Sequence, residues 1–213
     1  MHRKLKRTHV AVAVAGLVSA LAASLTLTPS GLATASATVV PFDDAQLPAN
    51  LKAIAAKVVI REEMATDLLV AVFPSGALQD AGVFVGRDAN GDDVVSPYNA
   101  DGMMGFASID RISAYGGVMV FPSAAGDAGQ VRRVSLVGVA EPRVGKVTIE
   151  LADGSSLRAE LVTAGQRGFK FFAYATDSSP RFPVAYRAYG TDGLEIKNED
   201  VSQALEPPAG DLG

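Results

Sequence analysis

The sequence contains no cysteine and no tryptophan, and its two histidines, His2 and His9, both lie near the N-terminus. Without cysteine there is no disulfide, no thiol nucleophile and no lipid attachment at a cysteine. Without histidine after residue 9, the rest of the chain cannot build a Ser-His-Asp triad, the usual zinc site or a His-ligated haem. Paired carboxylates remain a candidate for hydrolytic chemistry, since glycoside hydrolysis needs no histidine.

Residues 1–37 have the pattern of a secretory signal peptide. Residues 2–7 are basic, residues 10–27 form an apolar run, and Ala35-Ser36-Ala37 is a small-x-small cleavage site before Thr38. The apolar run has 18 residues, the lower edge of membrane-spanning length, so an uncleaved anchor is the alternative. We expect a secreted, extracellular protein without a stable membrane anchor after cleavage.

The charge balance argues against two classes of partner. The chain has 19 Lys and Arg against 23 Asp and Glu, and removal of residues 1–37 would change its net charge from −4 to −8. Nucleic acids and anionic lipid surfaces both attract Lys/Arg patches, which such an acidic chain is poorly suited to supply. We expect no nucleic-acid partner and no cofactor. The oligomeric state is left open.

Residues 134–162 carry the clearest local signal, a β-hairpin. Apolar and polar residues alternate on both sides of a turn at Asp153-Gly154. The apolar positions are Val147, Ile149 and Leu151 before the turn, and Leu157, Ala159 and Leu161 after it.

The same pattern predicts the register of the hairpin. A one-residue shift in the strand pairing would point the apolar side chains of one arm toward solvent. The odd-numbered residues of both arms must therefore share one face. The loop then holds an odd number of residues, either 153–155 or 152–156. This register places Glu150 directly opposite Arg158 on the solvent face.

The remaining chain beyond the leader consists mainly of short apolar runs separated by turns. One short helix is predicted over residues 48–57, with a single helix continuing to Ala65 as the alternative. Further strands are predicted over residues 67–73, 81–87, 103–109, 117–121, 131–139, 169–174, 184–189 and 194–196, with a second hairpin turn at residues 190–193. The predicted fold is therefore all-β: a sandwich or barrel of about ten short, mostly antiparallel strands with one short N-terminal helix.

Residues 122–129 are small or polar and form the best candidate for an internal boundary. They divide the chain into an N-terminal β-rich part over residues 38–129 and a C-terminal β-sandwich part over residues 130–200. Residues 201–213 are predicted to be a frayed tail. Each part would be small for a domain, so one continuous sandwich is the alternative.

The C-terminal part resembles a segment of secreted actinobacterial proteins. The residues that carry the resemblance are Gly138-Val139, Pro142, Val144, Val147, Ile149, Leu151, Asp153-Gly154, the strand over residues 169–174 and the AYGTDG turn. The basic N-terminus and the Ala/Val/Gly-rich composition are similar too. The resemblance implies a β-sandwich and export, but no site residue, because those relatives have no assigned function.

One loop has the composition of a calcium site. Asp88, Asn90 and Asp92 place oxygen-bearing side chains at alternate positions, and Ca²⁺ prefers oxygen ligands. The EF-hand spacing is not met, because the sixth position is Asp93 and the twelfth is Asn99. The alternative is a solvated turn, in which Asp, Asn and Gly are favoured for their local backbone hydrogen bonds.

Aromatic residues concentrate in the last third of the chain. We expect Phe169, Phe171 and Tyr186 to face the core. Phe172, Tyr174 and Tyr189 form the candidate contact surface for an extracellular protein or glycan.

Two carboxylate pairs, Glu62-Glu63 and Glu150/Glu160, are candidates for glycoside hydrolysis, which needs two suitably spaced acids and no histidine. Glu62 and Glu63 would point to opposite faces of a strand, and Glu150 and Glu160 belong to an exposed sheet face. The expected function is therefore that of a non-catalytic binding or structural module. The alternatives are an extracellular hydrolase that uses only carboxylates and a Ca²⁺-stabilised structural domain.

Overall fold

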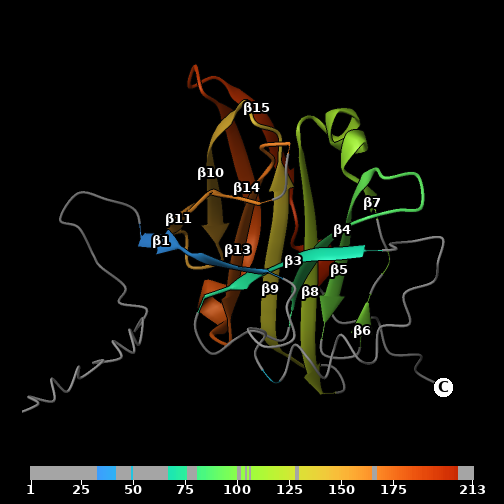
Figure 1. The fold of residues 1–213 in the computed structure, drawn as a ribbon. Helices are drawn as coiled ribbons and strands as arrows, with labels where there is room; N and C mark the ends of the chain where they lie inside the picture. The colour runs from blue at the N-terminus through green and yellow to red at the C-terminus, as the bar shows by residue number, and fades with distance from the viewer. Residues whose placement is uncertain are drawn as a thin grey trace, which may run out of the picture.

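The computed structural model describes residues 33–41, 49, 67–75, 81–99, 102–103, 105, 107–127, 130–164 and 167–205. Strands dominate this part of the chain and form three sheets (Figure 1). The predicted all-β, sandwich-like fold is confirmed. The helix expected over residues 48–57, apart from Ala49, and the leader before residue 33 lie outside the described residues.

The first sheet has five strands and contains the hairpin predicted around Asp153-Gly154. Its order is β1 (Ala33–Ala35), β11 (Ser156–Ala159), β10 (Val144–Leu151), β14 (Pro183–Gly190) and β15 (Glu195–Asp200). Neighbouring strands are antiparallel except β1 and β11, which run parallel.

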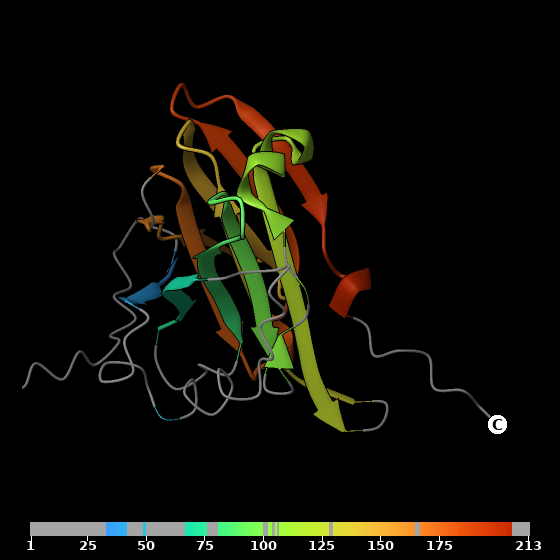
Figure 2. The ribbon, with the colours of Figure 1, turned by 45° about the vertical axis from the view of Figure 1, so that its right-hand side comes forward.

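The second sheet has four strands and is built around one long hairpin. Its order is β12 (Val162–Thr163), β13 (Lys170–Thr176), β9 (Gln130–Ala140) and β8 (Val118–Asp127). The β8–β9 hairpin reaches beyond the other strands at the end away from η1 (Ile109–Tyr115), a 3-10 helix (Figure 2). Two shorter 3-10 helices, η2 (Ser179–Arg181) and η3 (Gln203–Leu205), lie later in the chain.

The third sheet has six strands from the first half of the chain. Its order is β2 (Ala37–Pro41), β3 (Asp67–Pro74), β4 (Gly82–Arg87), β5 (Asp93–Asn99) and β6 (Gly102–Met103), with β7 (Ala107–Ser108) also paired to β5. The strand predicted over residues 103–109 is in fact two short strands followed by the start of η1. The described helices include none that is both long and apolar enough to cross a membrane.

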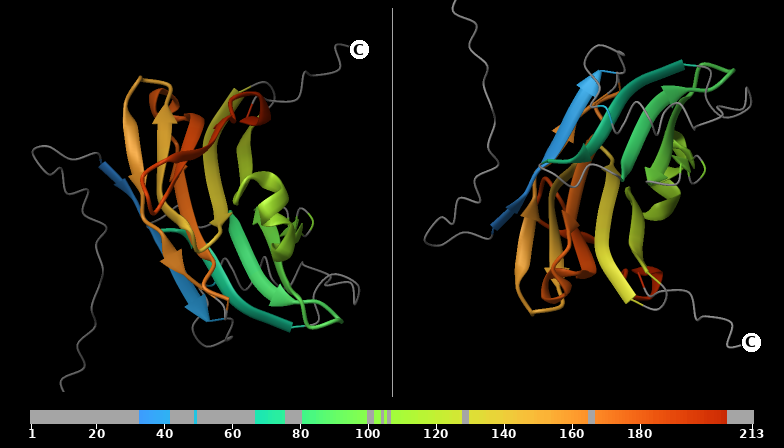
Figure 3. Two further views of the ribbon diagram at one scale, coloured as in Figure 1. Left: turned by 90° about the horizontal axis from the view of Figure 1, so that it is seen from above. Right: turned by 90° about the horizontal axis from the view of Figure 1, so that it is seen from below.

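The three sheets are stacked, because the four-stranded sheet has a hydrophobic core on each face. On β9 and β13, Leu136 and Phe172 pack into the core shared with the five-stranded sheet. Their neighbours Val137 and Phe171 pack into the core shared with β3, β4 and β5 of the six-stranded sheet. Views from above and below show the strands of the two outer sheets on either side of β8 and β9 (Figure 3).

This stacking confirms one aromatic prediction and corrects another. Phe171 and Tyr186 are fully buried, as expected, and Phe169 is partly buried against the core. The prediction that Phe172 and Tyr174 lie on an exposed face is wrong, since they are 0% and 8% exposed. A strand of a central sheet buries both of its faces, so alternate residues of β13 do not point to solvent.

The hairpin formed by β10 and β11 has the predicted facing but a different register. Val147 and Ile149 face Ala159 and Leu157, as the odd-numbered pairing requires. Arg158, however, lies opposite Thr148, so the predicted Glu150–Arg158 pair is wrong by two residues. The loop is residues 152–154, closed by hydrogen bonds from the Leu151 amide to the Ser155 carbonyl and from the Gly154 amide to the Leu151 carbonyl.

Three hairpins in the described part of the chain use this same three-residue loop with a left-handed glycine at its end. The second is the predicted turn between β14 and β15, with Gly193 at φ 83°, and the third joins β4 and β5, with Gly91 at φ 83°. In each, the residue before the loop accepts from the glycine amide and donates to the residue after the loop. In the β10–β11 loop, hydrogen bonds from the hydroxyl and amide of Ser155 lower the pKa of Asp153.

Two boundaries differ from those expected. Residues 122–127 are not a linker but the second half of β8, and the core beside η1 combines residues from both predicted parts of the chain. The tail is ordered further than expected, because Val201 and Leu205 are buried in the core. Residues 206–213 lie outside the described residues.

Candidate binding site beside η1

The site is organised by η1, a single 3-10 helix at one end of the sandwich. Ile109 and Ile112 are buried and attach the helix to the core. The Ser108 hydroxyl caps its first turn by accepting from the Asp110 amide at 3.3 Å. Gly116, at φ 74°, ends the helix, and its amide donates to the Ser113 carbonyl. Asp110 and Ser113 are thereby left on the exposed side.

The turn between β9 and β10 lies against the end of this helix. The Glu141 amide donates to the Gly117 carbonyl at 2.9 Å. A Cβ on Gly117 would lie 2.9 Å from Glu141 Oε2 and 3.1 Å from Arg143 Nη2, so only glycine lets the two side chains approach this closely. The Ser113 hydroxyl donates to Glu141 Oε1, and Arg143 Nε donates to Glu141 Oε2.

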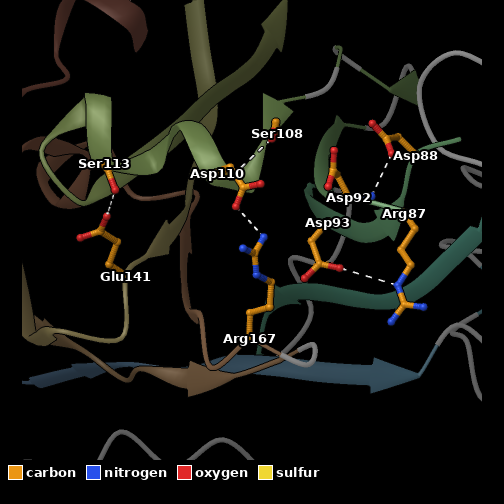
Figure 4. Close-up of polar contacts among 9 residues, drawn as sticks. All are labelled: Arg87, Asp88, Asp92, Asp93, Ser108, Asp110, Ser113, Glu141 and Arg167. Carbon is orange, nitrogen blue, oxygen red and sulfur yellow. Dashed lines mark hydrogen bonds and ion pairs between the residues drawn. The ribbon is translucent and has the colours of Figure 1, made fainter. Parts of the chain in front are cut away.

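These contacts surround an open hollow of about 340 Å³. Its lining is formed by Ile109, Asp110, Ser113, Glu141, Pro142, Arg143 and Phe169. We call it the η1 hollow. Beside it, Arg167 reaches across to Asp110, with 2.5 Å between Nη1 and Oδ1 (Figure 4).

The charged groups in and directly beside the η1 hollow balance each other. Two carboxylates, Asp110 and Glu141, are matched by two guanidinium groups, those of Arg167 and Arg143. Ile109, Pro142 and Phe169 supply the apolar part of the wall. The hollow therefore offers hydrogen-bonding groups beside an apolar surface, and its charges balance once Arg167 beside it is counted.

Neighbouring loops hold this end of the molecule together. The Thr191 amide, in the β14–β15 turn, donates to the Arg143 carbonyl at 3.0 Å. Lys197 on β15 donates to the carbonyls of Tyr115 and Val118, at 2.8 and 3.0 Å. The helix, the β9–β10 turn and the β14–β15 hairpin are thus tied to one another at the same end of the sandwich (Figure 1).

Large apolar side chains are also exposed at this end. Tyr115 at the end of η1 is 51% exposed, and Leu194 beside the β14–β15 turn is 67% exposed. Neither residue lines the η1 hollow, and single exposed apolar side chains are common on protein surfaces.

Tyr189, the third residue of the predicted contact surface, lies beside a different hollow. Lys146 Nζ sits 4.4 Å from the centre of its ring. The two residues line a hollow of about 300 Å³ together with Gly145, Gly190, Thr191 and Gly193. The structure therefore does not bring Tyr189 together with Phe172 and Tyr174, which are in the core.

The predicted calcium loop is one of the three equivalent hairpin loops. Asp88 Oδ1 accepts from the amide of Asn90 at 2.9 Å and from the amide of Asp92 at 2.9 Å, and so stabilises the turn. Figure 4 shows the contact between Asp88 and Asp92. Because two other loops adopt the same backbone, the conformation of this one is explained by the turn alone. Within the described ranges, no group of three or more His, Cys, Asp or Glu residues is placed to hold a metal ion.

The predicted carboxylate pairs are distributed differently. Glu62 and Glu63 lie outside the described residues. Glu150 forms an ion pair with Arg187 of β14 at 2.6 Å, and Glu160 is exposed beyond the end of β11. The carboxylates that do line one hollow, Asp110 and Glu141, were not singled out from the sequence.

Sequence reasoning missed the η1 hollow because its residues form no motif. Asp110, Glu141 and Phe169 come from three separate segments, and only folding brings them together. One signal was available: the Gly116-Gly117 pair ends a helix, and Glu141-Pro142-Arg143 interrupts two strong strand patterns. Such breaks mark loops, where binding residues are concentrated.

Comparisons with protein-family models, with curated proteins and with solved structures gave no match. The geometry of the η1 hollow is therefore the basis on which a function is proposed below.

Proposed function

We propose that this protein is a non-catalytic extracellular binding module and that it holds a glycan in the η1 hollow. The observation that carries the proposal is the combination of an apolar wall with a charge-balanced set of hydrogen-bonding groups. A sugar ring presents C–H groups on its faces and hydroxyls at its edge. Phe169 and Pro142 can pack against the C–H groups of the ring face. The carboxylate, guanidinium and hydroxyl groups can hydrogen-bond the sugar hydroxyls.

The contacts around the hollow support binding by a preformed site. Glu141 is 14% exposed and is held from two sides by Ser113 and Arg143. Gly117 and Thr191 fix the backbone of the same turn. A site whose side chains are already held in place loses less conformational entropy when a ligand binds.

The carboxylate-only hydrolase is the second candidate, because Asp110 and Glu141 line one hollow. A glycosidase needs one of its two carboxyl groups to carry a proton that it can donate. Here Glu141 accepts from Ser113 and Arg143, and Asp110 accepts from Arg167. All of these partners are donors, an arrangement that suits two acceptors and favours binding over hydrolysis.

A glycan array carrying neutral and acidic saccharides tests the proposal, followed by calorimetry with a saccharide that binds. We expect Glu141→Gln to weaken binding about tenfold, because it removes one charge-assisted acceptor. Glu150→Gln is the matched control, since Glu150 also pairs with an arginine but lies on a sheet face away from the hollow. Its affinity should equal that of the unchanged protein.

Four results would count against the proposal. Absence of binding to every saccharide excludes a glycan ligand of the kinds on the array. Equal losses in Glu141→Gln and Glu150→Gln place the site elsewhere. Release of reducing sugar during the incubation identifies a hydrolase, and a rise in melting temperature with Ca²⁺ favours the calcium-stabilised domain.

A further inference from the structure

The segment Ala33–Pro41 joins the two outer sheets. β1 pairs with β11 of the five-stranded sheet, and β2 pairs with β3 of the six-stranded sheet. Only Ser36 separates the two strands, and its carbonyl accepts from the Ser75 amide at 2.9 Å. The segment passes close to β12 and β13, at the edge of the central sheet.

Its contacts belong to the core of the protein. Ala35 is 5% exposed and packs in the same core as Phe172 and Tyr186. Its carbonyl accepts from the Glu160 amide at 2.8 Å. On the other side of Ser36, the Thr38 and Ser75 hydroxyls hydrogen-bond at 2.8 Å.

These contacts conflict with the cleavage position expected from the sequence. A cut after Ala37 would remove β1, withdraw the partner of the Glu160 amide and leave β11 as an unpaired edge. Unpaired strand edges invite pairing with other chains, and natural proteins usually cover or charge them. The cut would also place a charged α-amino group on Thr38, within β2.

We propose that residues 33–41 stay in the exported protein as a clasp between the two outer sheets, so that any leader cut falls before Ala33. The inference rests on strand pairing and burial and on the export proposed above, and it does not depend on the proposed glycan site. It assigns a structural role to the small residues that otherwise look like a cleavage motif.

Intact-mass analysis of the protein secreted by an exporting host tests the position of the cut. The expected mass includes residues 33–41. A secreted chain that begins at Thr38 would overturn the proposal.

A pair of full-length variants tests the clasp itself. Ala35→Asp places a carboxylate in the core and should lower the urea midpoint of the secreted protein, whereas Ser36→Asp changes an exposed side chain and should leave it unchanged. The mass of each secreted variant is measured as well, so that a displaced cut is detected. Equal midpoints in two variants that retain the segment would also overturn the proposal.

Discussion

Gly138 shows how one small residue determines the packing of a large one. It lies on β9 directly opposite Phe172 of β13. A Cβ at this position would lie 2.2 Å from Phe172 Cζ, far inside van der Waals contact. The ring is fully buried, so the absence of a side chain at Gly138 provides the space that it occupies.

We predict that Gly138→Ala destabilises the protein by about 1–3 kcal/mol, the usual range for overpacking a tight core. Urea unfolding with an unchanged m-value measures the loss. Gly154→Ala is the control, because its Cβ would meet no atom within 4 Å. Its effect comes only from the positive φ of 80° and should be about 1 kcal/mol. A Gly138→Ala variant as stable as the unchanged protein would contradict this account of the packing.

Individual residues were predictable where local pattern decides their environment. Leu157 and Ala159 face the core as their alternation requires. Phe172 was misplaced because alternation cannot reveal a second core on the other side of a strand. The η1 hollow could not be predicted beyond its loops, since Asp110 and Glu141 meet only through tertiary packing.

At the scale of elements, the β10–β11 hairpin shows what a neighbouring strand adds. The two arms alone suggest that Glu150 pairs with Arg158, but Arg158 lies opposite Thr148. On its other side β10 pairs with β14, and there Arg187 approaches Glu150. The pattern within the hairpin fixes which face is buried, while the turn conformation and the third strand decide which charges meet.

A double-mutant cycle distinguishes the two pairings. We expect Glu150→Ala and Arg187→Ala to show a coupling energy of about 0.2–1 kcal/mol, the range for exposed cross-strand charge pairs. Glu150→Ala combined with Arg158→Ala should be additive. The free energies come from urea unfolding at low salt, where screening is weakest. A coupling confined to Glu150 and Arg158 would contradict the observed register.

At the scale of the whole molecule, the central sheet makes the two cores depend on each other. β9 and β13 contribute Leu136 and Phe172 to one core, and Val137 and Phe171 to the other. Neither core can open without disturbing strands that also form the other. Residues 122–127 therefore do not separate two independent units, although the composition of this stretch resembles a linker.

This arrangement predicts a single cooperative unfolding transition. Phe171→Leu and Phe172→Leu change adjacent residues that face opposite cores, so each serves as a probe of one side. Each should lower the midpoint of the same transition, because a poorly filled core position lowers the free energy of unfolding by roughly 1 kcal/mol or more. Tyrosine fluorescence and far-UV circular dichroism, followed in parallel, should give coincident curves for both variants. If Phe171→Leu instead produced a separate early transition while Phe172→Leu shifted only a later one, the layers would unfold independently, and the shared strands would not couple them.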